Sequence, residues 1–179
     1  MLSGIQNGNV TGLTGFGASA HLVLKMIRFR YPESRVIVFA RGEKERSFAI
    51  ELGAVWAGDI TDKPPFKADA IIDTTPVWKP VVKALENLVP GGKMVINAIR
   101  KENNDQDVLI NLDYPTHLWM EKQIISVANV TREDVKSFLS IAAEMKLEPE
   151  IQVFNLENAN EALLEIKNKK IKGAKVLKI

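Results

Sequence analysis

Short apolar runs alternate with amphipathic segments along the whole chain. The runs have the length of buried strands, and the segments between them repeat apolar residues at helical spacing. Strands are expected at residues 10–14, 35–40, 54–57, 70–72, 93–99, 123–127, 152–154 and 175–179. Helices are expected at residues 21–29, 43–52, 77–88, 132–145 and 159–167, and a turn at 90–92.

This alternation predicts a parallel sheet. Ala70-Ile71-Ile72 is an unbroken apolar run, as a strand covered on both faces requires. Each helix can return the chain to start the next strand in the same direction through a right-handed crossover. We therefore predict an α/β fold in which six principal strands form a doubly wound parallel sheet with helices on both faces.

The turn after the first strand carries the spacing G-x-G-x-x-A between a strand and a helix. Gly15 permits the tight turn, and Gly17 lets the backbone approach a pyrophosphate. The following amides would point at the phosphates from the positive end of the helix dipole. The context predicts a Rossmann domain that binds a nicotinamide dinucleotide, although such a turn can also bind nothing. The candidate binding residues are Gly15, Phe16, Gly17, Ala18 and Ser19.

The end of the second strand favours NADP over NAD. The position 20 residues beyond Ala20 is Ala40, where an enzyme using NAD would place an acid for the ribose hydroxyls. Arg41 instead offers a guanidinium to a 2′-phosphate, with Arg46 as support. In the alternative interpretation, Arg41 is a solvated surface residue and the pocket accepts either cofactor.

Composition narrows the remaining classes of function. The 179 residues, 46% hydrophobic, fit one globular domain over residues 1–179. A net charge of +2 gives no reason to expect nucleic acid or a membrane as partner. The chain has no cysteine and only two histidines, so a metal centre within it is not expected. Without a long apolar run or a basic leader, we expect a soluble, cytoplasmic protein.

Several motifs together resemble the cofactor domain of the zinc-containing alcohol dehydrogenases of the medium-chain dehydrogenase/reductase superfamily. They are Gly12-Leu13-Thr14-Gly15-Phe16-Gly17-Ala18-Ser19-Ala20-His21, Glu51-Leu52-Gly53-Ala54, Asp73-Thr74-Thr75, Pro90-Gly91-Gly92-Lys93-Met94-Val95-Ile96, Thr131-Arg132-Glu133-Asp134 and Ile171-Lys172-Gly173-Ala174-Lys175-Val176-Leu177. The resemblance covers nearly the whole chain. It implies hydride transfer between an alcohol or carbonyl and the nicotinamide, with zinc on a GroES-like catalytic domain that this sequence lacks. The chain alone is then expected to bind cofactor without turnover, and the substrate is not readable from it.

The resemblance also implies where the nicotinamide lies. Thr74 and Thr75 would line one wall, while the backbone of Ala98, Ile99 and Val127 would hold the carboxamide. Thr75 could equally cap the following helix. Many relatives place an arginine near Ala174 that reaches the pyrophosphate, and here only Lys172 or Lys175 could replace it.

The remaining features favour structural interpretations. His21 is expected to pack beside the glycine turn, and no catalytic role is assigned to His117. The lysine-rich end is expected to be a solvated face, and residues 100–107 a mobile surface loop. Apolar residues in the last two strands would be exposed without the catalytic domain. Members of the family that the chain resembles commonly dimerise by joining their sheets edge to edge, so we predict a homodimer.

Two rival functions remain open at this level. A stand-alone, non-catalytic nucleotide-sensing module would use the same fold. A methyltransferase that uses S-adenosylmethionine shares a glycine-rich first turn, but it would need an acid after the second strand, where Ala40 and Arg41 stand.

Overall fold

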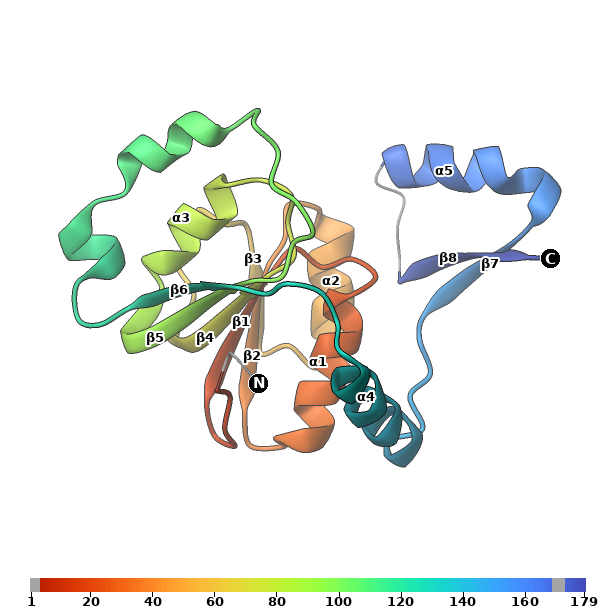
Figure 1. The fold of residues 1–179 in the computed structure, drawn as a ribbon, viewed down its shortest axis with the longest axis horizontal. Helices are drawn as coiled ribbons and strands as arrows, with labels where there is room; N and C mark the ends of the chain where they lie inside the picture. Colours follow the sequence, from red (N-terminus) through yellow and green to blue (C-terminus); the bar gives the residue numbers. More distant parts are fainter. Residues whose placement is uncertain (1–3, 169–172) are drawn as a thin grey trace.

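The computed structural model describes residues 4–168 and 173–179. Its main element is a six-stranded parallel sheet in the order β3-β2-β1-β4-β5-β6 (Figure 1). The strands are β1 (Val10–Thr14), β2 (Arg35–Phe39), β3 (Trp56–Gly58), β4 (Ala68–Asp73), β5 (Leu88–Ile96) and β6 (Gln123–Ser126). The strand order reverses between β1 and β4, which is where a doubly wound sheet binds its ligands. The predicted doubly wound α/β fold is confirmed.

Helices cover both faces of this sheet because its strands are apolar on both sides. Along β2, Val36 and Val38 face one core, while Ile37 and Phe39 face the other, as the period of a strand requires. The first core is completed by α1 (Ala20–Arg30) and α2 (Glu43–Glu51), and the second by α3 (Lys79–Leu85). Figure 1 shows α1 and α2 on one side of the sheet and α3 on the other.

The turn predicted at residues 90–92 is a bulge inside β5. Ala68 pairs with Leu88 and Ala70 pairs with Lys93, so the residues between them on β5 leave the ladder. Gly91 allows this with a φ of +72°. The strand therefore begins at Leu88, which is fully buried. The predicted end of the preceding helix at residue 88 was wrong, because α3 ends at Leu85.

Two short helical turns lie between β5 and β6, where no element was predicted. They are η1 (Gln106–Asn111), of 3-10 type, and η2 (Tyr114–Leu118), a π turn, and both contact α3. The polar residues around them show no helical period, which explains why the sequence pattern missed them.

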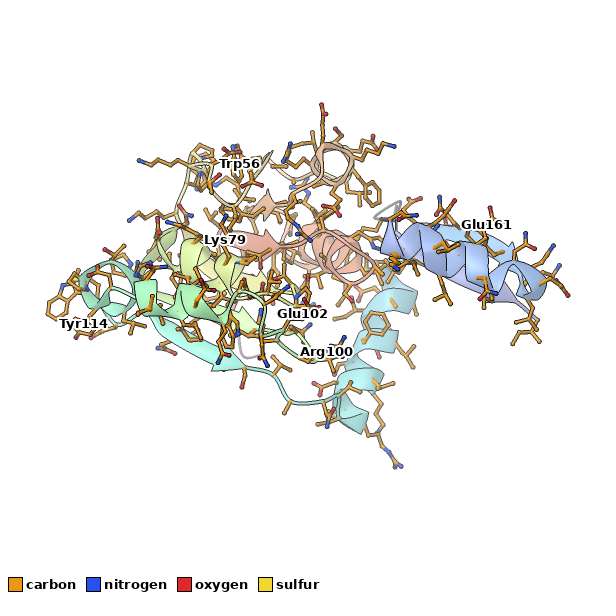
Figure 2. All side chains as sticks on the ribbon, turned by 90° about the horizontal axis from the view of Figure 1, so that it is seen from above. Trp56, Lys79, Arg100, Glu102, Tyr114 and Glu161 are labelled. Atoms are coloured by element: carbon orange, nitrogen blue, oxygen red, sulfur yellow. The ribbon has the colours of Figure 1, made fainter. Side chains whose placement is uncertain are left out.

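The C-terminal part forms a separate small unit. This unit follows α4 (Arg132–Glu144), and it contains two parallel strands, β7 (Ile151–Asn155) and β8 (Ala174–Lys178). The connection between the two strands contains η3 (Leu156–Asn158) and α5 (Ala159–Lys167). Figure 1 shows this unit to one side of the main sheet, and Figure 2 shows Glu161 of α5 and Tyr114 of η2 at opposite ends of the molecule. The last two predicted strands exist, but they pair with each other. Within the described ranges, no helix has both the length and the apolar character needed to cross a bilayer.

Candidate functional site

The glycine turn after β1 presents free backbone amides at the switch point. Gly15 has a φ of +77°, and its amide donates to the Phe39 carbonyl at 2.8 Å, which ties the turn to β2. A Cβ added to Gly17 would meet nothing within 4 Å, so this side of the turn is open. In the described part of the chain, the amides of Gly17, Ala18 and Ser19 have no acceptor. Unpaired amides ahead of a helix are the donors that bind a pyrophosphate, so the turn fits a dinucleotide.

Phe16 anchors this turn from below. Its side chain is only 4% exposed, and its ring meets that of Phe48 edge to face at a centroid distance of 5.6 Å. The side chain is therefore part of the core, and only the backbone of Phe16 can face a cofactor.

The loop after β2 is held by Arg46. Its Nη1 donates to the carbonyls of Ala40 and Arg41, both at 3.0 Å. The Arg41 side chain is exposed and has no partner among residues 4–168 and 173–179. The structure thus leaves the guanidinium of Arg41 available, while Arg46 fixes the backbone that carries it.

An acid that the sequence analysis did not consider follows β3 nearby. The Ala40 amide donates to the Gly58 carbonyl at 2.9 Å, so β3 ends beside β2. Asp59 comes next, and the hydrogen bond from the Thr61 amide lowers the pKa of its carboxyl, with a smaller contribution from the charge of Arg46. The charge of Arg46 therefore favours the ionised form of this carboxyl.

Thr74 and Thr75 lie against the glycine turn. The amide and hydroxyl of Thr74 donate to the Thr14 carbonyl at 3.1 and 3.0 Å. A Cβ on Gly15 would lie 3.0 Å from Thr75 Cγ2 and 3.1 Å from Thr74 Oγ1. The structure therefore brings the turn after β4 into contact with the turn after β1.

The alternative role of Thr75 as a helix cap was wrong. Its hydroxyl donates to Asp73 Oδ1 at 2.7 Å. The amides at the start of α3 donate instead to the carboxylate of Asp105, at 2.8 Å from Trp78 and 2.8 Å from Lys79. Asp105 was expected in a mobile surface loop, and its contact with α3 contradicts that expectation.

Ala98, Ile99 and Val127 follow the adjacent ends of β5 and β6. The Val127 amide donates to the Ile96 carbonyl at 3.0 Å, so its own carbonyl is the group left for a ligand. The Ile99 side chain is fully exposed. These backbone groups stand at the same edge of the sheet as Thr74.

Asp73 and Lys101 form an ion pair at the same edge, which the sequence analysis missed. The Asp73 carboxylate is fully buried, and Lys101 Nζ lies 2.5 Å from its Oδ2. The Lys101 side chain is 11% exposed, so the expected surface loop at residues 100–107 was wrong for this residue as well. A lysine within a polar stretch gives no signal that it folds inward.

His21 packs beneath the glycine turn, as predicted. It is fully buried, its Nδ1 lies 3.3 Å from the Gly17 carbonyl, and its ring lies beside Phe48. Nε2 has no partner within the described residues. Burial lowers the pKa of His21, since a proton added at Nε2 would be buried without an acceptor; Lys25 lowers it by less.

We expect this histidine to make the fold less stable in weak acid. The unfolded chain takes up a proton as pH falls through the ordinary value of 6.5, whereas the folded chain does so only at lower pH. The free energy of unfolding should therefore fall below that pH. Urea unfolding between about pH 7.5 and about pH 5 should show a shallower decline for His21→Leu than for the natural protein. Equal slopes would contradict this assignment.

The side chains of His117 and Lys175 also contact other residues of the protein. His117 is buried, its Nδ1 lies 2.9 Å from the Asp113 amide nitrogen, and its Nε2 lies 3.6 Å from Glu86 Oε1. Lys175 pairs with Glu165 at 2.5 Å with its side chain 3% exposed, so the predicted solvated face was wrong here. Lys172, the other candidate for the pyrophosphate, lies outside the described residues.

In the described ranges, His, Asp and Glu side chains nowhere gather in a group that could hold a metal ion.

Comparison with known proteins shows what the chain is similar to. No protein-family model matches the chain. A probable alcohol dehydrogenase, AdhA, of Mycobacterium tuberculosis is 37% identical over 172 residues, which cover 96% of this chain and 48% of the relative. The chain thus spans about half the length of the curated relative it matches.

Solved structures of dehydrogenases share the fold. A cinnamyl alcohol dehydrogenase of Sorghum bicolor has a TM-score of 0.79 at 20% identity and covers 96% of this chain and 48% of its own. The CAD protein of Helicobacter pylori, complexed with NADP(H), has a TM-score of 0.80 at 17% identity over 98% of this chain and 49% of its own. Acetophenone reductase of Geotrichum candidum, in complex with NAD, has a TM-score of 0.74 at 16% identity over 98% of this chain and 50% of its own. In sequence, the chain is thus similar to about half of an alcohol dehydrogenase, and it shares its fold with these solved structures.

Proposed function

We propose that residues 1–179 are the cofactor-binding Rossmann domain of an alcohol dehydrogenase-like oxidoreductase and bind NADP in preference to NAD. The observation that carries this proposal is the row of unpaired amides at Gly17, Ala18 and Ser19, next to a glycine with a φ of +77°. The nicotinamide complexes of the Helicobacter and Geotrichum proteins support the cofactor class.

Each part of the cofactor has candidate partners at this edge of the sheet. The amides of the glycine turn bind the pyrophosphate, and Arg41 binds the 2′-phosphate while Arg46 holds the loop. The turn with Thr74 and Thr75 and the backbone after β5 and β6 enclose the nicotinamide. When bound, this ring supplies the hydride acceptor or donor.

The chain has no cysteine, and His, Asp and Glu side chains of the described residues form no group that could hold zinc. We assign zinc and the choice of alcohol or aldehyde to a catalytic domain outside this sequence. The chain by itself should then bind NADPH without oxidising alcohols. Calorimetry with NADPH and an alcohol oxidation assay with added zinc test this directly. Alcohol oxidation by the isolated chain would contradict this proposal. If the chain binds the nucleotide and the full gene encodes no catalytic domain, the result would favour the rival nucleotide-sensing module.

Replacing Arg41 should change the preference for cofactor. Arg41→Ala removes the charge beside the 2′-phosphate, so the affinity for NADPH should fall about tenfold or more while the affinity for NADH changes little. Fluorescence titration with both cofactors measures the ratio. Arg132→Ala, which removes an exposed arginine on α4, serves as the matched control. An equal loss for both cofactors in Arg41→Ala would remove the proposed role.

We also expect a homodimer. The C-terminal unit exposes apolar side chains, among them Val153 at 59%, Leu163 at 62% and Leu164 at 58%. β6 ends the main sheet, with Ile124 42% exposed, and offers an edge to a second copy. Light scattering should give twice the mass of the chain, and a monomer at high concentration would contradict this expectation.

A further inference from the structure

One buried carboxylate joins the end of a strand to two loops at the switch point. Asp73, the last residue of β4, accepts hydrogen bonds at Oδ1 from the hydroxyls of Thr14 (2.5 Å) and Thr75 (2.7 Å). Its Oδ2 accepts from Lys101 Nζ. Thr14 ends β1, Thr75 belongs to the turn after β4, and Lys101 belongs to the loop after β5. Asp73 therefore connects the elements that surround the proposed nicotinamide subsite.

Lys101 uses all its donors on the turn after β4. Besides Asp73, Nζ donates to the carbonyls of Thr75 at 2.8 Å and Val77 at 3.0 Å. An ammonium has three protons, so these acceptors leave none for a ligand. The charge also lies 5.7 Å from the centroid of the Trp78 ring. Lys101 thus acts on the protein rather than on a bound molecule.

The loop after β5 is fastened to that turn at further points. The Glu102 amide donates to the Pro76 carbonyl at 2.7 Å, and the Asp105 carboxylate accepts from the start of α3. Figure 2 labels Arg100 and Glu102, the two neighbours of Lys101 in the chain. Ala98 and Ile99 lie between β5 and this fastened stretch, so Lys101 limits how far they can move from Thr74.

We propose that Lys101 is a positioning residue for the nicotinamide half of the cofactor, which it serves by holding the turn after β4 and the loop after β5 at a fixed separation through Asp73. This inference rests on the proposed function. Among the residues that the structure describes, Lys101 contacts residues 73–78 and none in the glycine turn. Its loss should therefore loosen the nicotinamide subsite and leave the pyrophosphate and adenosine subsites intact.

The test compares two ligands that differ by the nicotinamide end. Lys101→Met removes the ammonium and keeps the apolar stem, and Lys136→Met changes an exposed lysine of α4 as the control. Calorimetry should show about tenfold weaker binding of NADPH by Lys101→Met, and binding of 2′-phospho-ADP-ribose within about twofold of the natural protein. Lys136→Met should bind both ligands normally.

The outcomes separate this inference from the proposed function. If the natural protein binds neither ligand, the proposed function fails. The inference is overturned if the natural protein binds both ligands and Lys101→Met weakens the binding of the two ligands equally or weakens the binding of neither. Lys101 would then have only a structural role, or no role in binding. Should Lys101→Met not fold, as circular dichroism would show, the double variant Asp73→Asn with Lys101→Met removes both buried charges. This variant should fold and still lose affinity for NADPH selectively; unchanged selectivity would overturn the inference as well.

Discussion

Gly15→Ala should reduce the affinity for NADPH about 100-fold. Gly15 has a φ of +77°, where a Cβ costs about 1–2 kcal/mol. The new Cβ would also lie 3.0 Å from Thr75 Cγ2 and 3.1 Å from Thr74 Oγ1. The glycine turn and the turn after β4 must therefore move apart, and we expect the amides of the glycine turn to lose their common direction. Calorimetric titration with NADPH measures the loss.

Gly8→Ala is the matched control for this experiment. Gly8 has a φ of +86°, and a Cβ there would meet nothing within 4 Å. The variant suffers the same backbone strain away from the site, so it should lose about 1 kcal/mol of unfolding free energy and bind NADPH normally. Normal binding by Gly15→Ala, at a stability comparable to that of Gly8→Ala, would show that the glycine turn does not hold the cofactor.

The central strands of the main sheet were predictable because both of their faces are largely buried, so apolar residues run through them, at residues 36–39 of β2 and 70–72 of β4. All five residues of β1 are buried and the glycine turn follows immediately, so the sequence could indicate the end of the sheet at which the candidate site lies. Its backbone geometry follows from the same residues, since Gly15 takes a conformation that other residues avoid.

The contacts between loops could not be predicted. Asp73 and Lys101 are 28 residues apart, and neither a hydrophobic period nor a turn motif relates them. Lys175 was misjudged for the same reason, because its partner Glu165 is brought to it by the pairing of β7 with β8. A pattern shows which segments are apolar, but it does not show which polar side chains fold inward to meet.

Phe48→Ala should be the most destabilising change among those considered, with a loss of about 3–5 kcal/mol of unfolding free energy. Phe48 lies on α2 and is 5% exposed. Its ring contacts Phe16 at 5.6 Å and lies 6.0 Å from the His21 ring, so it supports the glycine turn from within the core. Removing it leaves a cavity below the residues that present the free amides. Urea unfolding followed by circular dichroism measures the loss.

Phe29→Ala provides the comparison, because Phe29 lies on α1 with 42% of its surface exposed and should change stability by no more than about 0.5 kcal/mol. The two variants remove the same side chain, so their difference isolates the burial of Phe48. If the glycine turn depends on that support, Phe48→Ala should also bind NADPH more weakly at temperatures where it is fully folded, whereas Phe29→Ala should not. A folded Phe48→Ala with normal affinity would mean that the hydrogen bond from Gly15 to Phe39 is sufficient to hold the turn.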